Sequence, residues 1–139
     1  NAIKKLGNKE QRWMTDKDHK VSREIVYFAK ENKVSVIRLE KLANIRQTAR
    51  TSRKHNKNLH TWSFYRLASF IRYKAKLEGI KVEYVNPAYT SQTCPNCSEK
   101  NKAQDRKYKC KCGFEKHRDI VGAMNIRYAP VVDGNSLPA

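Results

Sequence analysis

The sequence predicts an α/β fold, in which two helix–strand pairs are followed by a cysteine-rich module and a final helix. One observation is that amphipathic helical patterns alternate with short, apolar, β-branched runs, as they do in α/β proteins. A second is that all four cysteines of the 139-residue chain fall between residues 94 and 112. A module this small cannot build a sufficient core of its own, so we expect it to need a metal ion.

The first helix–strand pair is expected within residues 15–40. Thr15 or Asp16 can cap a helix whose apolar residues recur at helical spacing and which ends near Asn32. Residues 34–39 are short, apolar and β-branched, and this pattern predicts a buried strand that ends at Glu40. Before this pair, the chain is basic and has few apolar positions.

The second helix–strand pair is expected within residues 61–85. Thr61 offers an N-cap for a helix that runs to Gly79, which stands where a left-handed C-cap is expected. Residues 80–85 alternate enough to form a second strand, and Pro87 ends it.

The last helix is expected after the cysteines. It can begin near His117 or Arg118, and Pro130 stops it. We expect residues 131–139 to form a frayed tail. The predicted core is therefore helix, strand, helix, strand and helix, with the cysteine module between the last strand and the last helix.

The cysteines are spaced as metal ligands, in the pairs Cys94-x-x-Cys97 and Cys110-x-Cys112. Thiolates bind Zn²⁺ tetrahedrally, so each pair must sit on a tight turn that directs two sulfurs at one ion. Two disulfides are the alternative. They fit poorly, because neither short pair closes easily on itself and no signal segment directs the chain to an oxidising compartment. We predict structural zinc, with one tighter knuckle at the C-x-C pair.

The net charge favours a polyanion as partner. The formal charge is +17, from 30 lysine and arginine residues against 13 acids. Nucleic acid is the first candidate. An acidic membrane surface is the alternative, but it requires apolar residues opposite the charge and few are available. No apolar run approaches the roughly 20 residues that cross a bilayer, so we expect a soluble cytoplasmic protein.

The positive charge is concentrated in residues 41–77, which contain ten lysines and arginines and no acid. Such side chains share one face of a helix, or follow a phosphate backbone if the segment is a loop. An ordinary solvated surface is the alternative, but it mixes the two signs of charge. We expect residues 41–60 to form a long, mobile excursion that contacts nucleic acid. The candidate contacts are Arg46, Arg50, Arg53, Lys54 and Lys57.

Two acids stand out in so basic a chain. Glu40 is at the carboxyl end of the first predicted strand, where open α/β sheets gather their sites, and Asp119 is in the first turn of the last predicted helix. Two carboxylates that converge there could hold Mg²⁺ for phosphodiester hydrolysis. The alternative is structural: Asp119 stabilises the helix dipole, and Glu40 is solvated or paired with a lysine.

Other side chains admit two interpretations. Arg118, beside Asp119, forms either an ion pair or a phosphate contact. Four aromatic residues could stack on bases, but their helical spacing favours packing in the core. They are Trp62, Tyr65, Phe70 and Tyr73. The four histidines lack metal-ligand spacing and are interpreted as non-ligands: His19, His55, His60 and His117.

Several runs of the sequence resemble one family in the same order. The strongest are Pro87-Ala-Tyr-Thr-Ser-Gln-Thr-Cys94-Pro-Asn-Cys97, Tyr108-Lys-Cys110-Lys-Cys112-Gly-Phe and His117-Arg-Asp119-Ile-Val-Gly-Ala-Met-Asn125-Ile. Upstream, Ile37-Arg-Leu-Glu40-Lys-Leu42 and Trp62-Ser-Phe extend the resemblance over most of the chain. These runs resemble the carboxyl end of TnpB, the OrfB-type insertion-sequence transposases that are related to type V CRISPR effectors.

The resemblance implies a RuvC-like nuclease domain of RNase H fold with an inserted zinc ribbon. On this basis, residues 1–92 and 115–130 form the nuclease portion, residues 93–114 form the zinc ribbon, and residues 131–139 form a tail. The Cys110-x-Cys112 knuckle departs from the commoner family pattern without removing a zinc ligand.

The resemblance also implies a site of three acids that bind Mg²⁺ and cut DNA. By position, Glu40 resembles the second acid and Asp119 the third. The first acid has no match here and is expected in a segment that precedes this chain, so we expect the chain alone to be inactive. In the family an RNA guides the cut, which makes guide RNA and DNA the implied partners and DNA recombination and transposition the implied processes.

Three hypotheses follow. The first is the nuclease portion of a TnpB-like transposon protein, which requires Glu40 and Asp119 to converge. The second is a non-catalytic zinc-ribbon module that only binds nucleic acid. The third is a structural ribbon for protein contacts, which would bind DNA weakly and with little dependence on salt.

Overall fold

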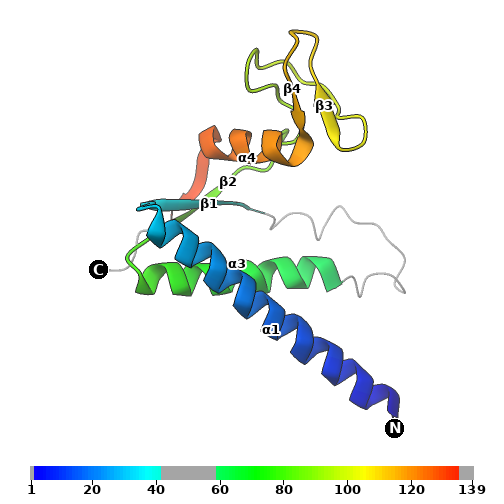
Figure 1. The fold of residues 1–139 in the computed structure, drawn as a ribbon, viewed down its shortest axis with the longest axis vertical. Coiled ribbons are helices and arrows are strands. Elements are labelled where there is room, and N and C mark those ends of the chain that lie inside the picture. Colours follow the sequence, from blue (N-terminus) through cyan, green and yellow to red (C-terminus); the bar gives the residue numbers. More distant parts are fainter. Residues whose placement is uncertain (1, 42–58, 135–139) are drawn as a thin grey trace. The chain divides into compact units, whose positions relative to one another are not determined.

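The computed structural model describes residues 2–41 and 59–134 (Figure 1). Its contacts divide the described chain into two compact units. The first unit contains residues 2–37 and 59–82, and the second contains residues 38–41 and 83–134. In the described part of the chain, no helix is both long enough and apolar enough to span a membrane.

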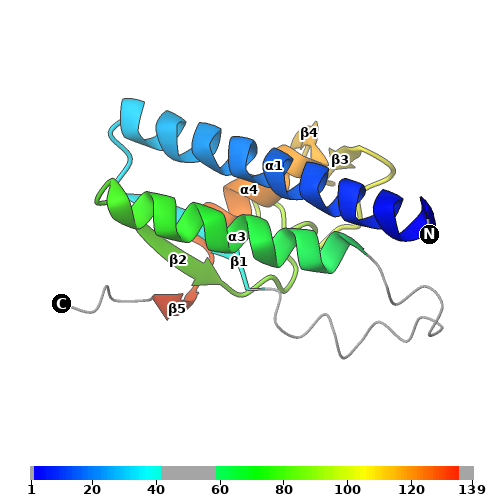
Figure 2. The ribbon, with the colours of Figure 1, turned by 90° about the horizontal axis from the view of Figure 1, so that it is seen from below.

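The first unit contains two helices, α1 (Ala2–Glu31) and α3 (Leu59–Leu77), which lie side by side (Figure 2). Val26 and Ala29 of α1 and Ala68, Ile71 and Ala75 of α3 are buried. Because these residues recur at three- and four-residue spacing, each helix presents one apolar stripe to its partner. Small side chains in both stripes allow the two backbones to approach closely.

Polar contacts also join the two helices. The buried Lys74 donates to the His19 carbonyl oxygen at 2.7 Å and to Ser22 Oγ at 2.6 Å. Burial, and then the nearby charge of Arg23, lower the pKa of Lys74. Arg66 pairs with Asp18, with Nε and Oδ2 2.7 Å apart. These contacts fix the register of α1 against α3, because a cation removed from water requires its polar partners.

Two aromatic residues of α3, Phe70 and Tyr73, make ring contacts within the first unit. The Phe70 ring stacks on the His19 imidazole, with ring centroids 3.8 Å apart, and meets the Tyr73 ring edge-on at 6.1 Å. Phe70 therefore packs within the protein, as its helical spacing predicted. Tyr73 is 44% exposed, so its packing is partial.

Strands β1 (Val36–Glu40), β2 (Lys81–Val85) and β5 (Val131–Gly134) form a sheet in the order β1-β2-β5. β1 and β2 are parallel, because the amide of Lys81 bonds to the carbonyl of Ser35 and the amide of Lys41 bonds to that of Val85. Each of these two strands passes from the first unit into the second.

β5 corrects the expectation of a frayed tail over its four residues. It pairs antiparallel with β2, with Tyr84 opposite Asp133 and Val85 opposite Val131. The β-branched Val131 and Val132 suit a strand. The sequence pattern did not reveal this strand because its pairing partner lies almost fifty positions earlier in the chain.

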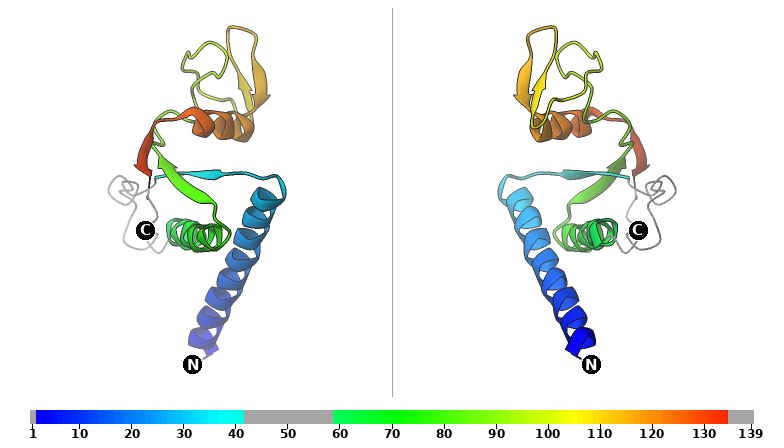
Figure 3. Two further views of the ribbon diagram at one scale, coloured as in Figure 1. Left: turned by 90° about the vertical axis from the view of Figure 1, so that its left-hand side faces the viewer. Right: turned by 90° about the vertical axis from the view of Figure 1, so that its right-hand side faces the viewer.

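The second unit also contains a small hairpin and a helix. β3 (Lys107–Lys109) and β4 (Glu115–His117) pair antiparallel, and α4 (Arg118–Tyr128) follows at once. Figure 3 shows the hairpin beside the first turns of α4. The core here consists of Cys94, Tyr108, Cys110 and Val121, with Ala103 and Phe114 packed against it.

The carboxyl end of α3 and the amino end of α4 carry the capping residues that the sequence predicted. α3 ends in a Schellman motif: Gly79 has a φ of +72°, its amide bonds to the Lys76 carbonyl, and the Ile80 amide bonds to the Ala75 carbonyl. His117 caps α4, with its Nδ1 accepting from the Asp119 amide at 3.3 Å. Both ends agree with the sequence.

The start of the first helix differs from the prediction. The apolar pattern and Thr15 placed it near residue 15, whereas α1 begins at Ala2. Residues 2–14 consist mostly of strong helix formers, so the helix continues without an apolar face to bury. Leu6 and Trp13 are accordingly 66% and 58% exposed.

Candidate metal centre and the Glu40 region

The four cysteine sulfurs lie together. Among the residues described, this is the one group of three or more histidine, cysteine or acidic side chains whose ligand atoms could share an ion, and its Sγ atoms all lie within 4.8 Å of one another. Cys94 and Cys112 are 3.7 Å apart, and Cys97 and Cys110 are 3.5 Å apart. Four sulfurs about 2.3 Å from one Zn²⁺ ion would be about 3.8 Å apart. A disulfide needs about 2.05 Å, and all four thiols are free.

Each cysteine pair sits on a turn closed by backbone hydrogen bonds. In the first, the Ser98 amide bonds to the Cys94 carbonyl at 2.9 Å. In the second, the Gly113 amide bonds to the Cys110 carbonyl at 3.0 Å, and Gly113 has a φ of +92°. A residue with a side chain is strained in that conformation. Gly113 thus allows the short C-x-C spacing to turn both sulfurs inward.

Side-chain amides support two of the sulfurs. Asn96 Nδ2 donates to Cys112 Sγ at 3.6 Å, and Asn101 Nδ2 donates to Cys110 Sγ at 3.2 Å. The Asn96 amide, followed by the Phe114 amide, lowers the pKa of Cys112 to about 6. Cys112 is therefore a thiolate at neutral pH, the form that binds a metal ion.

The pKa values of Cys97 and Cys110 depend on the neighbouring thiols. The Glu99 backbone amide lowers the pKa of Cys97. The contact of Cys97 with Cys110 and the burial of Cys97 outweigh this effect, together with the contacts to Cys112 and Cys94, and raise its pKa to about 12. The Cys112 backbone amide lowers the pKa of Cys110, but burial and the side-chain contacts with Cys112 and Cys94 together raise it, and the net direction is upward. Without a cation, these thiols resist losing their protons. A dication at the centre of the cluster would stabilise the thiolate forms and so favour their deprotonation. The donor set and its geometry fit zinc.

Glu40 is half-buried at the end of β1, and a buried threonine bonds to it. Thr90 Oγ1 lies 2.5 Å from Glu40 Oε1 and 3.2 Å from the Pro87 carbonyl oxygen. The shorter contact, to a charged oxygen, takes the hydroxyl proton. Asn125 of α4 holds the same loop, because its Nδ2 donates to the carbonyl oxygens of Thr90 and Thr93, both at 2.7 Å.

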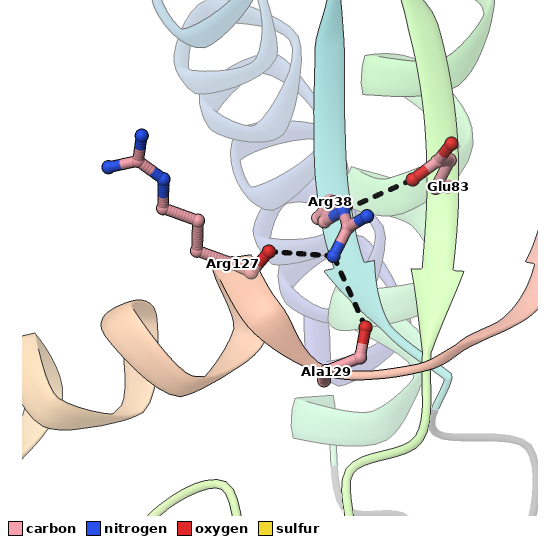
Figure 4. Close-up of polar contacts among 4 residues, drawn as sticks. All are labelled: Arg38, Glu83, Arg127 and Ala129. Atoms are coloured by element: carbon pink, nitrogen blue, oxygen red, sulfur yellow. Dashed lines mark hydrogen bonds and ion pairs between the residues drawn. The ribbon is translucent and has the colours of Figure 1, made fainter. Parts of the chain in front are cut away.

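Arg38 links β1 directly to the end of α4 (Figure 4). Its Nε bonds to Glu83 Oε2 of β2 at 3.1 Å. Its Nη1 donates to the carbonyl oxygens of Arg127 at 2.6 Å and Ala129 at 3.2 Å. Arg38 and Glu40 are two residues apart on one strand and so share a face of the sheet. Both residues are therefore tied to α4, Arg38 directly and Glu40 through Thr90.

Asp119 lies in the first turn of α4 and its side chain is 76% exposed. Its carboxylate oxygens are 3.6 Å from His117 Nδ1 and 3.6 Å from Arg118 Nε. Arg118 Nη1 also lies 3.5 Å from the Asp105 carbonyl oxygen. The ion-pair interpretation of Arg118 is thus consistent with the structure. Glu40 and Asp119 have different neighbours, and their sharing of a metal ion stays a prediction.

Five of the predicted nucleic-acid contacts lie outside the described residues, which omit 42–58. They are Arg46, Arg50, Arg53, Lys54 and Lys57. Sequence reasoning also missed three polar residues of this region: Arg38, Thr90 and Asn125. Arg38 carried a signal, since a charged residue inside a strand that the sequence predicts to be buried, on the same face as Glu40, requires a partner. Thr90 and Asn125 lie in runs that resemble the family, but no local pattern assigns a role to either residue.

Comparison with known proteins defines the class first. The Cas12f1-like TNB domain model matches residues 64–126, which run from α3 through the cysteines into α4. Among solved structures, a Cas12f1–sgRNA–target DNA complex aligns with a TM-score of 0.74 and 27% identity, over 91% of this chain and 36% of that chain. A CRISPR–Cas12f ternary complex aligns with a TM-score of 0.71 and 28% identity, over 89% and 26% of the two chains. The fold is thus a mixed α/β arrangement similar to part of Cas12f.

Similarity to curated relatives identifies the family within this class of proteins. TnpB-like protein MJ0751 of Methanocaldococcus jannaschii is 36% identical over 127 residues, 89% of this chain and 45% of that protein. Cas12f1 of Sulfoacidibacillus thermotolerans is 34% identical over 89% of this chain and 29% of its own length. "Putative transposase MJ0856.1" of M. jannaschii is 34% identical over 79 residues, 49% of this chain and 72% of that protein.

The chain belongs to the TnpB family. It spans less than half of the first two of these relatives.

Proposed function

We propose that this chain is the part of a TnpB-like DNA endonuclease that carries two of its three metal-binding acids, Glu40 and Asp119. The observation that supports it most is the double connection between β1 and α4. Arg38 bonds to the carbonyl oxygens of Arg127 and Ala129, and Thr90 bonds to both Glu40 and, through its carbonyl, Asn125. The strand with one acid and the helix with the other are thus held together.

The proposed domain organisation follows the family resemblance. Residues 1–92 and 115–130 would form a portion of a RuvC-like domain of RNase H fold, and residues 93–114 would form an inserted zinc ribbon. The cysteine geometry supports the ribbon, because the sulfurs are spaced for a tetrahedral ion. We propose a structural role for the zinc, since four protein ligands leave no open position for a substrate.

In the proposed reaction, bound Mg²⁺ would activate a water molecule and stabilise the leaving oxygen of the phosphodiester. Glu40 and Asp119 would supply carboxylate oxygens, the ligands that Mg²⁺ prefers. Thr90 engages Oε1 of Glu40, which leaves Oε2 as the oxygen proposed to coordinate the ion. Asp119 is exposed, so a substrate phosphate can reach an ion that it holds.

DNA and a guide RNA are the proposed partners. The net charge of +17 favours a polyanion, and one of the similar solved structures is a complex of Cas12f1 with sgRNA and target DNA. Arg118, next to Asp119, is proposed as a phosphate contact, together with the five basic residues between positions 46 and 57.

Mn²⁺ titration of the zinc-loaded chain, followed by NMR, tests whether the two acids converge. Mn²⁺ substitutes for Mg²⁺ and broadens the amide signals of nearby residues. We expect signals around Glu40 and around Asp119 to broaden together, at the same Mn²⁺ concentration. Glu40→Gln or Asp119→Asn should each abolish the broadening at both places. Glu24→Gln, which removes an exposed acid of α1, is the matched control and should leave the broadening unchanged.

Independent broadening at the two segments, or none, would contradict the nuclease proposal. The chain would then be a non-catalytic module, and DNA binding that falls steeply with salt would identify it as a nucleic-acid binder. Incubation of the isolated chain with Mg²⁺ and plasmid DNA is a second check. We expect no cleavage, because this chain supplies only two acids of the proposed site, Glu40 and Asp119.

A further inference from the structure

We infer that Thr90 and Asn125 are positioning residues that hold the Glu40 carboxylate in place for its metal ion. This inference rests on the proposed role of Glu40 as a metal ligand. Thr90 bonds to Glu40 through its hydroxyl group, and Asn125 bonds to Thr90 through its amide. The order of contacts is therefore α4, then the loop of residues 86–93, then the end of β1.

The Thr90 hydroxyl is suited to orient a carboxylate. Thr90 is 7% exposed, so water competes little for its proton. The 2.5 Å contact with Glu40 Oε1 is in the range of a charge-assisted O–H···O⁻ bond. A hydroxyl group has one proton to donate, and its bond to Oε1 restricts the rotation of the carboxylate. Hydrogen bonds that orient a metal-binding carboxylate commonly strengthen the binding of its metal ion.

Asn125 holds the loop that carries Thr90. Its Nδ2 donates to two carbonyl oxygens, those of Thr90 and Thr93, at 2.7 Å each. These contacts use both protons of the amide group. Thr93 immediately precedes Cys94, so one side chain of α4 fixes both the first cysteine turn and the threonine that bonds to Glu40.

The loop itself is restrained by local contacts. The Ala88 amide bonds to Asn86 Oδ1 at 2.9 Å, and Tyr89 has a φ of +59°. A tyrosine rarely adopts such a φ unless its surroundings hold it there. Because Tyr89 directly precedes Thr90, this conformation sets the direction from which the hydroxyl group approaches Glu40.

Three threonine variants of the zinc-loaded chain test the inference by the same Mn²⁺ titration. Thr90→Val keeps the shape of the side chain and removes the hydroxyl group. We expect it to weaken Mn²⁺ binding at Glu40 by about tenfold or more. Thr90→Ser restores the hydroxyl group and should restore most of the affinity. Thr93→Val is the matched control, because its hydroxyl group bonds to the Tyr89 carbonyl and not to Glu40.

Asn125→Ala tests the second contact. It should weaken Mn²⁺ binding in the same direction as Thr90→Val. The visible absorption of Co²⁺ bound to the four cysteines reports whether the cysteine module is still formed in each variant. A variant that loses this absorption has lost its fold, and the threonine series then decides.

The outcomes separate this inference from the proposed function. If Glu40→Gln abolishes Mn²⁺ binding while Thr90→Val leaves it unchanged, Thr90 has no positioning role and the proposed function stands. Equal losses in Thr90→Val and Thr93→Val would also overturn the inference, because they would indicate general loosening of the loop. If Glu40→Gln itself changes nothing, the proposed function fails and the inference fails with it.

Discussion

Tyr108 is the largest fully buried side chain of the protein, in the described part of the chain. Its hydroxyl group donates to the Gln92 carbonyl oxygen at 2.9 Å, and its ring meets Phe114 edge-on. Burial raises the pKa of Tyr108, so the phenol stays protonated and able to donate. It joins the hairpin strand β3 to the chain segment that leads into the first cysteine turn.

Tyr108→Phe removes this hydrogen bond and keeps the ring. We expect the zinc-loaded protein to lose about 1 kcal/mol of unfolding free energy. The loss stays this small because the Gln92 carbonyl still accepts from the Asn101 amide at 2.8 Å. Denaturant unfolding is the measurement, and Tyr27→Phe, at a residue 60% exposed, should leave the midpoint unchanged. A midpoint of Tyr108→Phe equal to that of the control would contradict the assignment.

At the level of single residues, the sequence predicted contacts that are close along the chain. The four cysteines span nineteen residues, and their spacing alone predicted that the sulfurs would meet. The partners of Glu40 and Arg38 were not predictable in this way. Thr90 is 50 positions from Glu40, and Ala129 is 91 positions from Arg38. Such pairs depend on the whole fold, and no local pattern specifies them.

Among the elements, α4 has an unusual carboxyl end. The C-cap residue Ala129 has extended dihedral angles, and the carbonyl groups of the last turn have no following helix turn to bond to. The Arg38 guanidinium donates to two carbonyl oxygens there, at Arg127 and Ala129. A cation at this end also complements the helix dipole. A residue of β1 thus performs the capping that a local side chain usually performs.

Arg38→Met removes these bonds while preserving the stem of the side chain. We expect a loss of about 2 kcal/mol or more in the unfolding free energy, because the two carbonyl oxygens and Glu83 all lose a charge-assisted hydrogen bond. Arg38→Lys should recover only part of it, since an ammonium group lacks the planar fork that reaches three acceptors. Amide exchange in α4 should speed up in both variants. Arg106→Met, at an exposed residue of the same unit, is the control and should leave exchange in α4 unchanged. If the Arg38 variants exchange their α4 amides as slowly as this control does, Arg38 has no capping role.

Elements were predictable where capping signals were strong. Gly79 and His117 marked the end of α3 and the start of α4, and both hold in the structure. The start of α1 was wrong by thirteen residues or more, because helix propensity without an apolar stripe gives no boundary. β5 was missed because an edge strand of four residues becomes a strand only through its partner β2.

At the scale of the whole molecule, the two units have different dependence on metal. Two of the four buried residues that form the core of the hairpin and α4, Cys94 and Cys110, are also candidate zinc ligands. The buried residues that α1 and α3 contribute include no cysteine. Removal of zinc by a chelator should therefore disorder the cysteine module and leave α1 and α3 helical. NMR spectra before and after chelation check this, and loss of α1 and α3 signals together with those of the module would contradict it.

Zinc affinity should depend steeply on pH. At pH 7, Cys112 is already deprotonated because its pKa is lowered to about 6, whereas Cys97, with its pKa raised to about 12, and Cys110 keep their protons. Zinc must displace these protons, so affinity rises with pH, by at least about a hundredfold per pH unit near neutrality. Below about pH 6 Cys112 also gains a proton, and the dependence steepens. Competition with a chromophoric chelator measures it, and an affinity independent of pH would contradict it.

The two units are defined by contacts and not by chain order. The chain therefore cannot be cut at one position into two fragments that each contain a whole unit. β1 belongs to both units, and Arg38 and Glu40 fall on the side of the second. The family-model match begins at residue 64 and so leaves β1 out. A fragment cut at that boundary would keep every cysteine and all of α4, yet lose the residue that caps α4 and the carboxylate that Thr90 holds. For protein engineering, the smallest segment worth transplanting therefore extends upstream to include β1.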